Sequence, residues 1–147
     1  MIRTAIITAL LVAAAPAALA ENPGDFIKYR QAMMKAIGGH TGATSQIVRG
    51  KVNPEGALQM HANALAELSK DLTSLVPEGS DFGETKAKEG IWSDWAKFEK
   101  AADDAKSATA AFAEAVTGGD AEKISTAFKS VGDSCKGCHK EFRQKDD

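Results

Sequence analysis

The sequence predicts an all-α protein whose mature part folds as an antiparallel up-down-up-down four-helix bundle. Three observations predict it: apolar residues recur at three- and four-residue steps in four segments, Gly and Pro separate the segments, and no stretch alternates with a period of two. Most connections between the segments are short, so consecutive helices are expected to pack as antiparallel neighbours.

Residues 1–20 are predicted to be an export signal that is cleaved, leaving residues 21–147 as one domain. Met1-Ile2-Arg3 supplies a positive start, an apolar run follows, and Ala18-Leu19-Ala20 forms a small-x-small cleavage site. A membrane anchor would need about 20 apolar residues, and Pro16 interrupts this run. We therefore expect a soluble mature chain that begins at Glu21.

The first predicted helix follows Pro23-Gly24, takes Asp25 as its N-cap and ends at Gly50. Its apolar seam runs through Ile27, Arg30, Met34, Ile37, Thr41, Thr44 and Val48. The second predicted helix opens at Asn53-Pro54, a capping residue followed by proline at the first helical position. Its stripe is the most regular in the chain and runs through Leu58, His61, Leu65, Leu68, Leu72 and Leu75.

The third predicted helix follows a long Gly/Ser/Asp-rich loop, residues 77–83, and stops at Gly118-Gly119. One of its sides carries Ile91, Trp95, Phe98, Ala102, Ala105, Phe112 and Val116. Asp120 is the predicted N-cap of the fourth helix. The stripe of that helix runs through Ile124, Phe128, Val131, Cys135, Cys138 with His139, and Phe142.

The charge balance argues against a nucleic-acid partner. The chain has 18 Lys and Arg against 20 Asp and Glu, and loss of Arg3 with the signal leaves a net charge of −3. A nucleic-acid-binding domain normally carries a marked basic excess.

The two cysteines of the chain belong to a Cys-x-x-Cys-His motif, Cys135-Lys136-Gly137-Cys138-His139. This is the attachment signature of a c-type haem. Residues three and four apart share one face of a helix. Two thiols can therefore bond to the two vinyl groups of one porphyrin while the imidazole binds its iron. We predict one covalent haem c on Cys135 and Cys138, with His139 as the proximal iron ligand.

Other interpretations of the motif are weaker. A disulfide between such close cysteines would constrain little of the unfolded chain. A thioredoxin-like motif follows a strand in an α/β fold, whereas this one lies late in a strandless chain. A structural zinc site needs four Cys or His ligands, and the only other histidines are the distant His40 and His61.

The chain resembles the class II cytochromes c, the family of cytochrome c prime. The resemblance covers nearly the whole mature chain and rests on the signal, the four helices and a Cys-x-x-Cys-His-x-x-Phe-Arg ending near the C-terminus. It also includes Tyr29-Arg30-Gln31, Ile91-Trp92-Ser93-Asp94, Val131-Gly132 and Ser134-Cys135. By resemblance, Arg30 and Gln31 contact the haem propionates, and Arg143 lies beside the proximal imidazole.

The residue on the distal side of the iron decides the function, because a closed iron exchanges electrons and an open one binds gases. The start of the first helix lies at the haem end in this topology, which leaves Met33 and Met34 as candidates. Met34 keeps step with the apolar seam and Met33 does not. His40 lies about 9 Å beyond Met34 along the helix, which is too far down the bundle to reach the iron. We predict Met34 as the distal ligand.

The resemblance supports the same position. Five residues after the Tyr, open members of the family hold a noncoordinating apolar residue, and the low-spin branch holds a methionine ligand, often before Lys and Ile-Gly-Gly. This chain reads Met34-Lys35-Ala36-Ile37-Gly38-Gly39. Met34 as an ordinary flexible core residue stays open as an alternative.

The main functional prediction is a periplasmic one-electron carrier that meets periplasmic or membrane-bound redox proteins, as a monomer or a homodimer. The alternative is a five-coordinate cytochrome c prime that binds nitric oxide or carbon monoxide at an open distal site. A haem enzyme such as a peroxidase needs a distal acid-base group, and none is expected near Met34.

Overall fold

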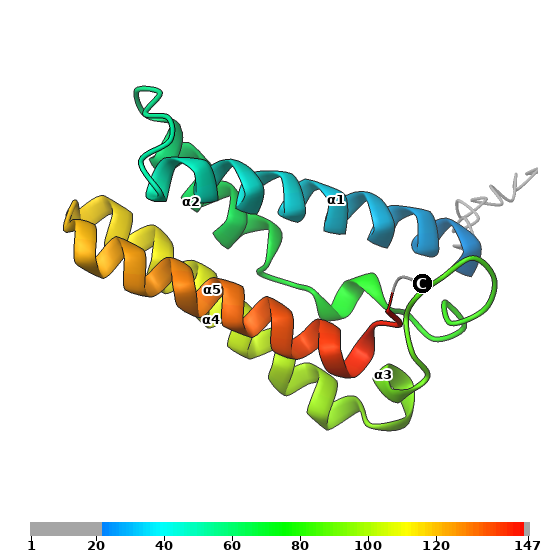
Figure 1. Ribbon diagram of the computed structural model, residues 1–147. Helices are drawn as coiled ribbons and strands as arrows, with labels where there is room; N and C mark the ends of the chain where they lie inside the picture. The colour runs from blue at the N-terminus through cyan, green and yellow to red at the C-terminus, as the bar shows by residue number, and fades with distance from the viewer. Residues whose placement is uncertain (1–21, 146–147) are drawn as a thin grey trace, which may run out of the picture.

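The computed structural model describes residues 22–145, and these form helices without any strand longer than one isolated bridge (Figure 1). The predicted export signal lies outside the described residues. The helices are α1 Pro23–Val48, α2 Ala57–Leu68, the 3-10 helix η1 Thr73–Leu75, α3 Gly90–Ser93, α4 Trp95–Gly118 and α5 Ala121–Phe142. The predicted all-α class and bundle are confirmed. No helix in this part of the chain is long and apolar enough to cross a membrane.

The N-cap of α1 lies three residues earlier than predicted. The side chain of Asn22 accepts a hydrogen bond from the Gly24 amide at 2.9 Å, and Pro23 occupies the first helical position. Asparagine before proline satisfies both preferences of a helix start. The predicted cap, Asp25, therefore lies in the first turn, where its negative charge favours the helix dipole.

Helix α2 is shorter than its leucine stripe predicts. It starts after Gly56, which adopts a left-handed φ of 70°, and it ends at Leu68. The Asp71 carboxylate then accepts hydrogen bonds from the Thr73 hydroxyl and the Ser74 amide. Such local side-chain bonds compete with the helix, so the chain turns and Leu75 is buried from η1 instead.

The third predicted helix is two helices. Asp94 interrupts it with φ −132° and ψ 63°, and its side chain caps α4 by accepting from the Lys97 amide. Trp95 was expected in the core. The break turns it outward and leaves it 41% exposed. Asp120 caps α5 as predicted, accepting from two amides at 3.0 Å.

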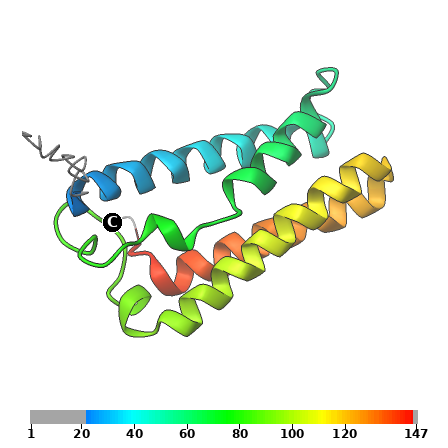
Figure 2. The same cartoon turned by 180° about the vertical axis from the view of Figure 1, so that it is seen from behind.

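Helices α1 and α2, α2 and α4, and α4 and α5 are packed neighbours, and α5 ends beside the start of α1 (Figures 1 and 2). Two apolar clusters hold the bundle. The middle cluster contains Ala62, Leu65, Phe112 and Val131, which are fully buried. The second lies towards the C-terminal end of α5 and contains Val76, Ile91, Phe98 and Phe142. This second cluster forms the floor of the candidate site.

Candidate functional site

A cavity of about 750 Å³ lies between the first half of α1, the chain from residue 72 to residue 87, α4 and the end of α5. Cavities that hold a small molecule or cofactor measure about 300–1,000 Å³. Apolar side chains supply much of the wall: Met34, Leu72, Leu75, Val76, Ala87, Ile91, Phe98, Ala102 and Phe142.

Helix α5 brings the motif residues to one side of this cavity. Cys138 and His139 line it directly. Cys135 lies one turn earlier, half-buried, and packs against the middle apolar cluster instead. Burial raises the pKa of each thiol.

The imidazole of His139 is held in the neutral form that binds a metal. Burial lowers the pKa of His139, and the positive charge of Arg143 lowers it further. Arg143 also lines the cavity, and its amide donates to the His139 carbonyl at 3.0 Å. Neutral imidazole is the form that coordinates iron or other transition metals.

Met34 reaches the cavity from α1, and its neighbour Met33 does not line it. The helical periodicity therefore predicted correctly which of the two methionines faces the cavity. Iron ligation by Met34 stays a prediction. His40 and His61 lie outside the cavity lining, and their Nδ1 atoms form a hydrogen bond of 2.9 Å between α1 and α2.

Arg30 is a buried cation, 7% exposed, at the edge of the cavity. Its guanidinium donates four hydrogen bonds to the chain after α2. The acceptors are the carbonyls of Leu75 and Ser80 and the hydroxyls of Ser80 and Thr85, at 2.8–3.1 Å. No carboxylate pairs with it among residues 22–145, and burial lowers the pKa of Arg30. A buried cation without a counter-ion suits a site that receives an anionic group.

Gln31 contributes less to the interior than Arg30. It is exposed at the cavity mouth, and its Nε2 donates to the Glu84 carbonyl at 2.7 Å. The observed contacts of both residues are thus with the loop beside the cavity, and their contact with propionates stays a prediction.

The donor set fits a haem. The cavity combines an apolar wall, a thiol next to a neutral imidazole on α5, a thioether on α1 and an uncompensated cation that could face a propionate. Sequence reasoning missed the loop wall, including Thr85, Lys86 and Ala87, because residues 77–89 have no periodicity from which their contacts could be predicted. Phe142 belongs to the apolar core, as expected, and it also lines the cavity, which the sequence did not predict.

Known proteins match this chain over most of its length. The profile of the family described as Cytochrome C' matches residues 25–143. A cytochrome c' from Rubrivivax gelatinosus is 38% identical over 128 residues, covering 85% of this chain and 98% of the relative. A cytochrome c-556 from Agrobacterium fabrum is 32% identical over 121 residues, covering 81% of each.

Solved structures give the same match. A nitric oxide complex of a cytochrome c prime variant from Alcaligenes xylosoxidans has a TM-score of 0.77 and 31% identity, covering 84% of this chain and 97% of that one. A carbon monoxide complex of another variant of that protein has a TM-score of 0.78 and 30% identity, covering 84% and 98%.

Proposed function

This chain belongs to the cytochrome c' family, and we propose that it is an exported haem c protein that binds nitric oxide or carbon monoxide beside Met34. Members of the family carry one covalently bound haem c. In the proposal, Cys135 and Cys138 hold the haem, His139 is the proximal iron ligand and Arg30 receives a propionate. The observation that carries it is the apolar cavity with His139 on α5 and Met34 on α1.

The haem iron supplies one-electron exchange and, where its sixth position is open, binding of small diatomic ligands. The residues on the α1 side decide between these uses. Arg30 and Gln31 precede Met34 on α1 by about one turn, and their side chains donate hydrogen bonds to the loop after α2. Neither is a free acid-base group beside Met34, and such a distal side suits nitric oxide and carbon monoxide better than oxygen activation. The nitric oxide and carbon monoxide complexes of relatives support this proposal.

The second candidate is the periplasmic electron carrier, in which Met34 ligates the iron. Its specific support is that Met34, and not Met33, lines the cavity. A thioether ligand would close the sixth position, and electron exchange would then need no change of ligands. The comparisons favour the gas-binding candidate, because gas complexes are among the related structures.

An optical spectrum of the purified holoprotein separates the candidates. Gas binding predicts high-spin oxidised and reduced spectra, carbon monoxide binding without displacement of a protein ligand, and little change in spin state on Met34→Ala. Met33→Ala is the matched control, because that neighbour does not line the cavity. A low-spin wild type with a Met-to-iron charge-transfer band, turned high-spin by Met34→Ala alone, would contradict gas binding and establish the electron carrier.

The cellular setting is part of the same proposal. Residues 1–20 would direct export to the periplasm, and removal of that segment would leave residues 21–147 as the working protein. As an electron carrier it would meet periplasmic or membrane-bound redox proteins, as a monomer or a homodimer. In the first candidate the protein binds a gas and in the second it exchanges electrons. No catalytic role is proposed for it.

A further inference from the structure

The last four carbonyls of a helix have no donor partner inside it and need donors from elsewhere. In α5 these are the carbonyls of residues 139–142, in the turn that carries the proposed iron ligand. The amide of Arg143 donates to the first of them, that of His139, at 3.0 Å.

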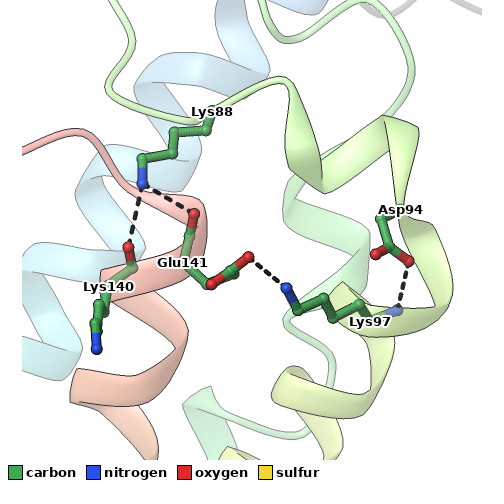
Figure 3. A network of polar contacts seen from close by, with 5 residues as sticks. All are labelled: Lys88, Asp94, Lys97, Lys140 and Glu141. Atoms are coloured by element: carbon green, nitrogen blue, oxygen red, sulfur yellow. Dashed lines mark hydrogen bonds and ion pairs between the residues drawn. The ribbon is translucent and has the colours of Figure 1, made fainter.

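Lys88 satisfies the other three. Its ammonium donates to the carbonyl of Lys140 at 3.1 Å and to that of Glu141 at 3.0 Å (Figure 3). Its backbone amide donates to the Phe142 carbonyl at 2.9 Å. One residue, 52 positions before Lys140 in the chain, therefore closes the end of α5. Its positive charge also opposes the negative end of the helix dipole.

The neighbouring residues fix Lys88 in this position. The chain from residue 86 to residue 88 runs beside the residues after α5, where the Gln144 amide donates to the Lys86 carbonyl at 2.8 Å. Ala87 and Arg143 form an antiparallel bridge.

A second contact holds the same turn from α4. Lys97 forms an ion pair with Glu141, and its own amide donates to the Asp94 cap (Figure 3). Phe142 is 5% exposed and packs edge-on against Phe98 at a centroid distance of 5.3 Å. The final turn of α5 is thus fixed by α4 on one side and by Lys88 at its end.

We propose that Lys88 is a positioning residue for His139. By satisfying three of the four terminal carbonyls, it keeps the last turn of α5 helical and so fixes the orientation of the imidazole. The inference rests on the proposed function, in which His139 binds the haem iron.

The test compares four holoproteins: wild type, Lys88→Met, Lys88→Arg and Lys140→Met. Methionine keeps the length of the Lys88 side chain and removes the ammonium donors to the Lys140 and Glu141 carbonyls, while the backbone amide still donates to the Phe142 carbonyl. Lys140 is the matched control because it lies in the same turn, its charge is equal, and its side chain points away from the cap (Figure 3). The readouts are the proton resonances of the proximal imidazole in the oxidised protein and hydrogen exchange of the Arg143 and Gln144 amides, with the Val131 amide as an internal reference.

Lys88→Met is expected to shift the imidazole resonances and to speed exchange of both end amides about tenfold, because the turn then frays locally. Exchange at Val131 should be unchanged. Lys88→Arg should restore much of the wild-type behaviour, and Lys140→Met should resemble wild type.

Wild-type imidazole resonances in Lys88→Met would overturn the inference. So would an equal effect of Lys140→Met, since charge alone would then explain it, or a Lys88→Arg variant that behaves like the methionine variant. These failures are distinct from failure of the proposed function. Failure of gas binding would appear in the wild type as a low-spin spectrum with a Met-to-iron band, and failure of haem attachment would appear as a wild type without haem.

Discussion

Replacement of the buried hydroxyl of Thr44 by a methyl group is expected to stabilise the protein. Thr44 is 0% exposed, and its Oγ1 has no hydrogen-bond partner within residues 22–145. A buried polar group without a partner costs about 1–3 kcal/mol. Valine keeps the branched shape and has a similar helix propensity. Thr44→Val should therefore raise the free energy of unfolding by about 1 kcal/mol.

Thr109 provides the matched control. It is 1% exposed, but its hydroxyl donates to the Ala105 and Lys106 carbonyls at 3.0 Å. Thr109→Val removes these bonds and should lower the free energy of unfolding by about 0.5–1 kcal/mol. Guanidinium unfolding of the oxidised holoprotein, with a check that the m-value is unchanged, measures both effects. If both valine variants lose stability to the same extent, the Thr44 hydroxyl has a partner and the reasoning is refuted.

Two further changes test other parts of the structure. Arg30→Met should lower the free energy of unfolding by about 2 kcal/mol or more, because charged hydrogen bonds to the loop are lost, and should make residues 77–85 more sensitive to protease. Gln31→Ala, which removes one exposed bond, should stay within about 0.5 kcal/mol of wild type; equal losses would contradict the role of Arg30. A double-mutant cycle of His40→Leu and His61→Leu should give a coupling of about 0.5–1.5 kcal/mol with no change in the haem spectrum. Zero coupling would contradict the hydrogen bond between the two histidines. An altered haem spectrum would contradict their placement outside the cavity.

The features predicted from the sequence are those set by local spacing. Cys138 and His139 share a helical face with Cys135 because of their positions in one helix, and Met34 keeps step with its apolar seam. Asp120 caps α5 by accepting from the amides of Glu122 and Lys123, which follow it directly in the chain. Each of these depends only on residues within a turn or two.

The features that the sequence did not predict depend on competition or on distant contacts. Asn22 is a better cap than Asp25 because proline follows it, and Asp71 ends the leucine stripe by bonding to its own turn. Asp94 divides the third predicted helix in the same way and leaves Trp95 exposed. The four bonds of Arg30 and the cap formed by Lys88 join residues more than 40 positions apart. The periodicity of a single helix cannot predict contacts between residues so far apart in the chain.

The covalent attachment of haem is tested most directly by the intact mass of the protein, exported from a host that matures c-type cytochromes. The account predicts the polypeptide from Glu21 to Asp147 plus one haem, and only polypeptide when Cys135 and Cys138 are both replaced by alanine. A colourless wild type whose mass equals that of the polypeptide alone would contradict it.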